Sequence, residues 1–431
     1  MFVISARQPF LTRVGGRVCE VSSTSCKISG LSQTAKLGDC VCAETDGEEM
    51  LAEVVHVDAS GVLVKPFHND IAVGLGTPAW HLGRLTVAPD ISWKGRVVNS
   101  LGHPIDNPRP VTRGIEVDPK KVRPPPAMHR QRIKQPVRTG LNAIDLFTPL
   151  CAGQRIGIFA GSGIGKSSLL AMLAEAQGFD TIVIGMVGER GREVREFLED
   201  AAPQTRARTV AVVSSGDESP MMRKLAPLTA TSVAEYFRDR GETVLLIIDS
   251  ITRFAHAARE VALAAGEPPV ARGYAPSVFS DLPILLERAG TGREGSGTIT
   301  GIYSVLVDGD DHNEPVADCI RGTLDGHIVL SRAIAEQGRY PAIDVLASVS
   351  RLSGQVWSPE EATLILSLRG LISRYEDTRD LRLVGGYQPG ADPELDKAVQ
   401  LTPKIYAHLS QGIDDLTDTA PFEKLAQVLA E

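Results

Sequence analysis

One glycine-rich loop has residue types and spacing suited to binding phosphate: Ala160-Gly-Ser-Gly-Ile-Gly-Lys-Ser167. An apolar, strand-like run at residues 155–159 precedes the loop, and a helix-like run at residues 168–173 follows it. Glycines let backbone N–H groups turn inward around an anion, and a helix N-terminus adds partial positive charge. Ala160 stands where the strict pattern has glycine, and its small size makes it a tolerated variant. A chance glycine-rich turn is the alternative, and the flanking strand and helix argue against it.

The last residues of this loop have distinct chemical roles. Lys166 can reach the β- and γ-phosphates of a nucleotide, and Ser167 can ligate Mg²⁺. The residues of the loop that we expect to bind a nucleotide are Gly161, Ser162, Gly163, Ile164, Gly165, Lys166, Ser167 and Ser168.

A carboxylate ends the apolar run Val244-Leu-Leu-Ile-Ile-Asp249. A buried strand of this kind would deliver Asp249 to the carboxyl edge of a sheet, where it can hold Mg²⁺ directly or through water. Asp249 could instead cap the helix that follows, and the two roles can coexist. We expect Ser167 and Asp249 to be the metal-binding residues.

A second carboxylate, Glu189, lies just past another strand-like run and is flanked by Gly188 and Gly191. Held near a γ-phosphate, it could orient and polarise water for in-line attack. Arg190 could fix that carboxylate or contact phosphate. The alternative is a surface ion pair between Glu189 and Arg190, which would contribute little. Together with Lys166 and Asp249, Glu189 predicts a hydrolytic site for Mg-ATP.

Two residues far along the chain are further candidates. Arg351 could reach the nucleotide of a neighbouring subunit as an arginine finger, a group that typically contributes about 10³–10⁵ in rate. Tyr340 precedes Pro341, which stiffens its backbone, and could stack on adenine. From the residues alone, ordinary packing explains these two equally well.

Patterning along the chain predicts three folded regions and one connector. Short β-rich runs separated by turn residues up to about residue 90 indicate a small antiparallel barrel. A proline-rich stretch at residues 104–126 indicates an extended connector. From about 140 to 350, strand-like runs at 156–159, 181–187, 209–213, 244–248 and 299–307 alternate with helix-like segments at 193–200 and 230–240. This alternation predicts an α/β fold with a parallel sheet. Helical spacing at 360–372 and 395–409 indicates a C-terminal helical domain.

Composition limits the function classes. The chain has 431 residues, a formal net charge of −8 and 5% aromatic residues. This acidic balance, with few aromatic platforms for stacking bases, argues against nucleic acid as a partner. The six cysteines lack metal-binding spacing and are expected to be buried or free thiols. No signal peptide and no membrane-spanning run is evident, so we expect a cytoplasmic protein.

Five stretches together resemble the rotary-type ATPases, which include the α and β subunits of F-type ATP synthase and the type III protein-export ATPases. They lie at residues 159–167, 188–194, 266–279, 307–315 and 324–328. Gly191-Arg192 resembles the export branch, and Asp308-Gly-Asp-Asp-His-Asn-Glu-Pro315 favours its flagellar members over its virulence members.

This resemblance implies a RecA-like P-loop core at residues 91–355, between an N-terminal β-barrel at 1–90 and a C-terminal helical domain at 356–431. It implies a hexameric ring with nucleotide at subunit interfaces. The residues to which it gives catalytic roles are Glu189, Lys166, Arg190 and, donated in trans, Arg351. Tyr340 and Tyr387 would line the adenine pocket.

The resemblance also implies partners and a location. The export apparatus, a stator-like regulator, chaperones and export substrates would bind the ring at the cytoplasmic face of the inner membrane. Association with the membrane would be peripheral, through the export gate. Only about a dozen residues precede the first predicted strand, whereas flagellar members usually begin with a longer segment that binds the regulator. That contact is therefore in doubt here, or lies elsewhere on the barrel.

Three other functions compete with flagellar export. A virulence-type secretion ATPase differs only in details of the acidic motif. A non-catalytic ring subunit lacks the catalytic glutamate, so Glu189 argues against it. A ring-shaped RNA translocase is disfavoured by the acidic composition.

Overall fold

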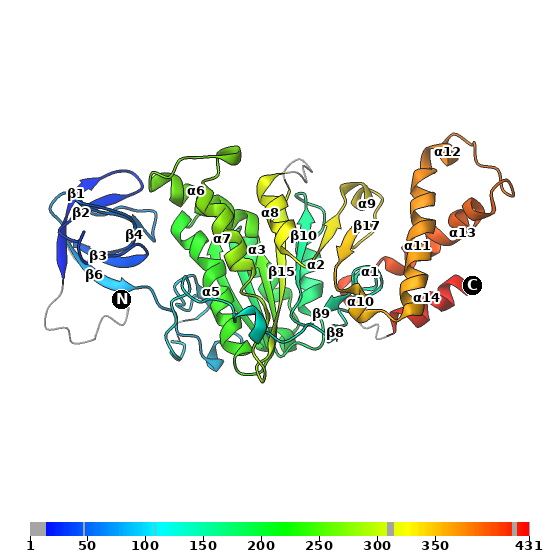
Figure 1. Cartoon of the computed structure of the whole chain (residues 1–431), viewed down its shortest axis with the longest axis horizontal. Coiled ribbons are helices and arrows are strands. Elements are labelled where there is room, and N and C mark those ends of the chain that lie inside the picture. The colour runs from blue at the N-terminus through cyan, green and yellow to red at the C-terminus, as the bar shows by residue number, and fades with distance from the viewer. Residues whose placement is uncertain (1–13, 46–47, 108, 308–313, 416–419, 431) are drawn as a thin grey trace.

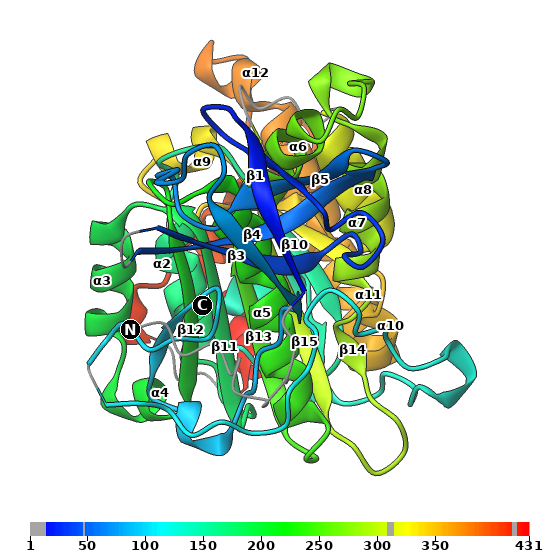
Figure 2. The ribbon, with the colours of Figure 1, turned by 90° about the vertical axis from the view of Figure 1, so that its left-hand side faces the viewer.

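The computed structural model describes residues 14–45, 48–107, 109–307, 314–415 and 420–430, and its three parts lie in a row (Figure 1). A β-barrel stands at one end, a sheet covered by helices lies in the middle, and a group of helices lies at the other end. Viewed from the barrel end, the barrel strands lie in front of the central sheet (Figure 2). The predicted fold class is confirmed by this arrangement.

The N-terminal barrel is closed by six antiparallel strands in the order β1-β2-β5-β4-β3-β6. Their bounds are β1 Gly15–Val21, β2 Cys26–Ser29, β3 Asp39–Thr45, β4 Glu48–Asp58, β5 Gly61–Pro66 and β6 Pro78–Arg84. The interior is filled by small and β-branched side chains, among them Val18, Ile28 and Val62. A closed barrel leaves no free strand edge, which explains how so few residues form a stable unit.

The connector at residues 104–126 runs from the barrel side to the central sheet. Its described residues form no helix, and their strand pairing is limited to isolated bridges at Pro104 and Val117. The buried Arg288 fixes its end, because the guanidinium donates a hydrogen bond of 2.6 Å to the Pro119 carbonyl and also pairs with Glu235.

The central sheet has the strand order β17-β16-β10-β15-β13-β11-β12-β7, with β14 paired to β15. Neighbours from β10 to β7 are parallel, whereas β17 and β14 are antiparallel to their partners. The strands are β7 Val97–Asn99, β10 Arg155–Ala160, β11 Thr181–Glu189, β12 Thr209–Ser215, β13 Thr243–Asp249, β14 Gly290–Thr291, β15 Thr298–Leu306, β16 Gly326–Leu330 and β17 Ile343–Ser350. Four of the five predicted strand runs fall within these elements, and the fifth, 299–307, extends one residue past the end of β15.

Both faces of this sheet are buried, as near-continuous apolar strands require. Along β13, Leu245 and Ile247 face one hydrophobic cluster, and Leu246 and Ile248 face the other. The larger helices around the sheet are α2 Lys166–Ala174, α3 Gly191–Asp200, α5 Pro220–Arg238, α6 Ile251–Ala264, α7 Pro276–Leu286 and α8 Pro315–Thr323. The period-two alternation on the strands therefore sets which helices cover each face.

The C-terminal part contains α11 Pro359–Asp377, α12 Arg379–Leu383, α13 Pro393–Leu409 and α14 Pro421–Ala430. Ser358 and Glu361 form a capping box at the start of α11, which satisfies backbone donors at that end. Both helices predicted here are confirmed, and the Gly385-Gly386 and Pro389-Gly390 interruptions lie between α12 and α13.

The remaining elements are short. They are α1 Asn142–Phe147, α4 Pro203–Ala207, α9 Arg332–Glu336, α10 Ser353–Val356, β8 Pro136–Val137, β9 Leu150–Cys151, and 3-10 turns at Ile91–Trp93, Ala127–His129, Ala271–Gly273 and Ile413–Asp415. Across the residues that the structure describes, no helix is both long and apolar enough to cross a bilayer.

Candidate active site

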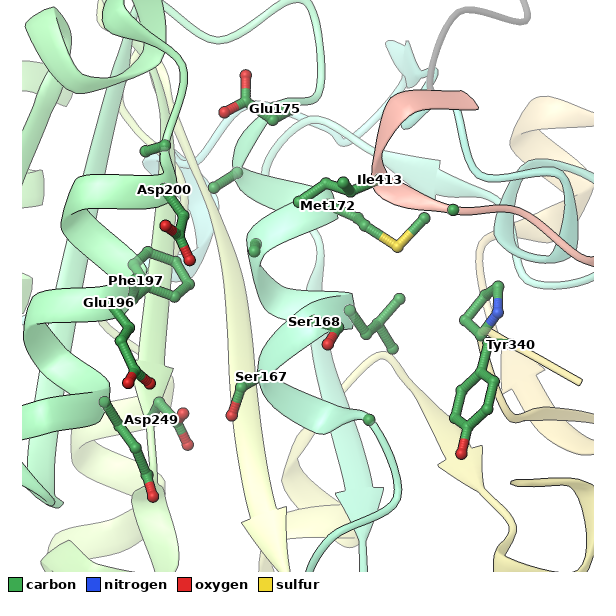
Figure 3. A pocket seen from close by; sticks show the side chains of 18 of the residues that line it. Ser167, Ser168, Met172, Glu175, Glu196, Phe197, Asp200, Asp249, Tyr340 and Ile413 are labelled. Atoms are coloured by element: carbon green, nitrogen blue, oxygen red, sulfur yellow. The ribbon is translucent and has the colours of Figure 1, made fainter. Parts of the chain in front are cut away.

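A cavity of about 530 Å³ opens at the carboxyl ends of β10, β11 and β13. Helix α2 forms one wall along its length and α3 another, with a segment following α13 beside them. Figure 3 shows Asp249, Glu196 and Phe197 on one side of α2 and Tyr340 and Ile413 on the other, with Met172 of α2 directed toward the latter side. Ligands of open parallel sheets bind at this edge, so the cavity lies where the phosphate loop was expected to act.

The phosphate loop has the backbone that its glycines predict. Gly163 and Gly165 have φ angles of 76° and 87°, a left-handed conformation that side chains with Cβ disfavour. Gly165 is the N-cap of α2, so Lys166 and Ser167 lie in the first turn of that helix. A Cβ on Gly165 would lie 3.4 Å from the ring of Tyr340, which therefore packs directly beside the loop.

Four side chains converge behind the loop. The Lys166 ammonium donates hydrogen bonds to Asp249 Oδ1 and, at 3.3 Å, to Ser304 Oγ. The Ser304 hydroxyl donates to the same Asp249 oxygen at 2.6 Å. Lys166 Nζ is also 3.7 Å from Glu189 Oε1. Both predicted carboxylates thus lie within reach of the lysine that was expected to contact phosphate.

Glu189 is buried, and its two oxygens have different surroundings. Oε2 lies 3.2 Å from Nη2 of Arg253 in α6. Oε1 is buried and accepts no hydrogen bond from the described residues. Burial, followed by the nearby charge of Asp249, raises the pKa of Glu189 to about 7, although Lys166 and Arg253 oppose the shift. A carboxylate with a pKa near neutrality and a free buried oxygen suits a group that orients water and accepts a proton.

The two predicted metal-binding residues face one another. Figure 3 shows the Ser167 hydroxyl directed toward the Asp249 carboxylate across the base of the cavity. Hydroxyl and carboxylate oxygens are hard donors that suit Mg²⁺. Over the described part of the chain, no group of three or more His, Cys, Asp or Glu side chains could hold a metal. Mg²⁺ fits this donor set, because it usually takes one or two protein oxygens together with water and substrate phosphates.

Both alternative explanations of the carboxylates can now be compared with the contacts. The N-cap of α6 is Ser250, whose hydroxyl accepts from the Arg253 amide, so Asp249 does not cap that helix. Arg190 lies 3.4 Å from Glu193, and its side chain is 77% exposed. Glu189 is buried instead, so the two residues do not form the surface ion pair that was the alternative to catalysis.

Tyr387, a predicted base-pocket residue, lies outside the cavity. Its hydroxyl donates a hydrogen bond of 2.7 Å to Asp396 of α13. Tyr340 and Ile413, by contrast, line the cavity.

Arg351 also lies outside the cavity. It directly follows β17, the edge strand of the sheet, and is exposed while its backbone N–H donates to the Asp325 carbonyl. This position suits a residue that acts on a neighbouring subunit.

Within the acidic motif at 307–315, residues 308–313 lie outside the described part of the chain.

Sequence reasoning missed four residues of the site. Arg253 of α6 pairs with Glu189, a residue distant along the chain, so nothing in its local sequence marks the contact. Ser304 could be found only from strand order, because β15 lies between β10 and β13. Gln411 and Ile413 line the cavity from a distant part of the chain, and nothing in their local sequence marks them.

The fold and site define a P-loop ATPase. Residues 140–350 match the ATP synthase alpha/beta family, nucleotide-binding domain, and residues 357–431 match the T3SS EscN ATPase C-terminal domain. The chain is 53% identical over 415 residues to the "Flagellum-specific ATP synthase" of Agrobacterium fabrum, covering 96% of this chain and 88% of the relative. It therefore belongs to the ATP synthase alpha/beta family, in the branch of flagellum-specific and type III secretion ATPases.

Two ATPases of type III secretion systems are also similar. The "SPI-2 type 3 secretion system ATPase" of Salmonella typhimurium is 45% identical, with 96% of this chain and 95% of the relative covered. The assembled ATPase EscN from the type III secretion system of enteropathogenic E. coli has a TM-score of 0.90 at 39% identity, covering 96% of this chain and 100% of EscN.

Replacing Glu189 by Gln keeps the size of the side chain but removes its negative charge. We expect Glu189→Gln to bind a fluorescent ATP analogue with an affinity within a few fold of wild type and to lose nearly all turnover, because general-base groups typically contribute 10²–10⁴-fold. Single-turnover hydrolysis and equilibrium binding measure the two effects. Turnover close to wild type would remove Glu189 from the proposed role.

The raised pKa of Glu189 predicts a pH dependence. Only the deprotonated carboxylate can accept a proton, so kcat/KM should rise as pH increases through about 7 and level off above it. Arg253→Gln removes a charge that lowers this pKa, so the rise should move to higher pH. The ionisation of ATP affects the pH profiles of wild type and Arg253→Gln equally, so it does not contribute to a difference between them. An unshifted profile in Arg253→Gln would assign the rise to another group.

Ser304 is expected to position Asp249. Both the hydroxyl of Ser304 and the ammonium of Lys166 bind Oδ1, which leaves Oδ2 for a metal or its water. We expect Ser304→Ala to raise the Mg²⁺ concentration needed for half-maximal binding of a non-hydrolysable ATP analogue by about tenfold. Ser304→Thr, which keeps the hydroxyl, is the control and should bind as wild type does. Equal Mg²⁺ dependence in the alanine variant would contradict this role.

Proposed function

We propose that this chain is a Mg²⁺-dependent ATP hydrolase that energises flagellar type III protein export. The observation that carries the proposal is the buried Glu189, whose Oε1 accepts no hydrogen bond from the described residues and lies 3.7 Å from Lys166 Nζ, beside Asp249. Sequence identity of 53% to a flagellum-specific relative supports the biological role.

The residues divide the work of hydrolysis. The loop from Gly161 to Ser168 would bind the phosphates through its backbone N–H groups and the N-terminus of α2. Ser167 and Asp249 would hold Mg²⁺, which supplies charge neutralisation across the β- and γ-phosphates. Lys166 would exchange its contact with Asp249 for one with phosphate oxygens, since a doubly charged terminal phosphate attracts the ammonium more strongly than one carboxylate.

Glu189 would act on the attacking water. Oε1, which accepts no hydrogen bond from the described residues, would accept one from the water, and Arg253, bound to Oε2, would keep the carboxylate oriented. Arg190, exposed at the start of α3, would contact phosphate or a neighbouring subunit once a nucleotide is bound. Tyr340, 48% exposed, would stack on the adenine base.

We further propose that six copies form a ring with nucleotide between subunits. Arg351 on the exposed edge of the sheet would contribute to the site of the next subunit, which is otherwise incomplete. EscN has been solved in assembled form and in complex with its central stalk EscO, so a related chain does assemble. Chaperones and export substrates would meet the C-terminal helices, and the regulator would meet the barrel end. The ring would lie at the cytoplasmic face of the inner membrane.

A virulence-type secretion system is the second candidate, because the SPI-2 ATPase is 45% identical over nearly the same length. Deleting the gene separates the two proposals. Loss of motility and of flagellar filaments supports flagellar export, whereas intact motility with loss of secreted effectors supports the alternative.

Mixing variants tests whether Arg351 acts in trans. We expect Arg351→Ala to lower turnover about 10³-fold, and Arg293→Ala, on an exposed turn at the opposite end of the sheet, to leave it unchanged. In mixed rings of Arg351→Ala and Glu189→Gln subunits, some interfaces pair an intact Glu189 with an intact Arg351. Activity should therefore return on mixing. If Arg351 acted within its own subunit, every site would keep one defect and mixing would restore nothing.

A further inference from the structure

The segment that follows α13 returns to the core and forms part of the nucleotide cavity. Gln411, Gly412 and Ile413 line the cavity beside Tyr340 and Pro341. Ile413 is 47% exposed and Tyr340 is 48% exposed, so both apolar surfaces are available to a bound base. Their positions raise the question of what holds this distant segment against the core.

Gln411 makes that attachment with both its backbone and its side chain. Its N–H donates to the Tyr340 carbonyl at 2.9 Å. Its side-chain amide donates to the Gly140 carbonyl at 3.0 Å, and its side-chain oxygen accepts from the Asn142 N–H at 2.6 Å. The Asn142 side chain donates in turn to the His408 carbonyl at 2.9 Å. Two amide side chains thus bind reciprocally, each to the backbone of the other segment.

These bonds satisfy groups that would otherwise be buried without partners. Gln411 is 9% exposed and Asn142 is 6% exposed. Asn142 opens α1, and the N-cap residue Leu141 makes no side-chain capping bond. The first free N–H of α1 is therefore capped by Gln411, from the other end of the chain. If one partner of a buried hydrogen bond is removed, the remaining donor or acceptor stays buried without a partner, and its full desolvation penalty lowers stability.

We propose that Gln411 is a positioning residue that couples recognition of the base to the C-terminal helices. The backbone N–H of Gln411 binds the Tyr340 carbonyl, and Ile413, two residues later, lines the cavity. Tyr340 and Ile413 therefore keep their separation only while the Gln411 side chain is hydrogen-bonded to Asn142 and Gly140. Displacement of α13 would draw Gln411 away from these partners and separate the two apolar surfaces, while the phosphate loop stays intact. The inference rests on the proposed function.

Comparison of two ligands tests the coupling. ATP carries a base, whereas inorganic tripolyphosphate offers only the phosphates. We expect Gln411→Ala to weaken Mg-ATP binding about tenfold, as the loss of one or two buried hydrogen bonds would do. Its affinity for tripolyphosphate should equal that of wild type. Gln388→Ala, at an exposed position in the turn before α13, is the matched control and should bind both ligands normally.

Hydrogen exchange tests the second half of the proposal. In wild type, ATP should slow amide exchange in α13 and in residues 410–415, and tripolyphosphate should not. In Gln411→Ala, ATP should give no such protection. Asn142→Ala removes only the bond to the His408 carbonyl. We expect it to weaken Mg-ATP binding about threefold and to leave tripolyphosphate binding unchanged. This milder variant provides the measurement should Gln411→Ala fold poorly.

Three results would overturn the inference. The first is wild-type affinity for ATP in Gln411→Ala. The second is an equal loss of affinity for ATP and for tripolyphosphate in both variants. The third is slower amide exchange in α13 of wild type when tripolyphosphate is added without ATP. Failure of the proposed function gives a different result, because the wild-type protein would then bind and hydrolyse no ATP.

Discussion

The site depends on the ion pairs that the Lys166 ammonium forms with two buried carboxylates, Asp249 and Glu189. Asp249 and Glu189 lie at the ends of adjacent strands, β13 and β11, and their charges would repel one another in a medium of low dielectric. Lys166 lies within reach of both, and Arg253 binds the far oxygen of Glu189. The cluster is therefore close to electrically neutral before any ligand arrives.

Strand order makes this arrangement possible. The strand β10 leads into the phosphate loop and β13 ends in Asp249, yet β15 lies between them. Ser304 of β15 is fully buried and bridges the gap, touching the lysine from one side and the carboxylate from the other. The sheet thereby fixes the separation of the phosphate-binding and metal-binding groups. Binding energy of a nucleotide need not be used to assemble them, which is the meaning of preorganisation here.

Local patterns were enough to predict most of the fold. Apolar runs of four to nine residues gave the central strands, since strands buried on both faces read as continuous hydrophobic segments. The loop, Asp249 and Glu189 were found because glycine spacing and strand ends leave marks in the sequence. Ser304, Gln411 and Ile413 were not found, because their importance arises from neighbours that are distant along the chain. Tyr387 was predicted from its expected region, but its hydroxyl binds Asp396 and the residue lies outside the cavity of this chain.

The cavity wall formed by residues 411–413 has a consequence for biogenesis. A ribosome makes the phosphate loop, both carboxylates and Tyr340 long before it reaches this segment. Until then, helix α1 lacks its capping partner and the cavity lacks the wall to which Ile413 contributes. A nascent chain can therefore fold its sheet and still hold nucleotide poorly. On the proposed coupling, full affinity for a nucleotide would be acquired only after residues 411–413 have been synthesised and bound to the core.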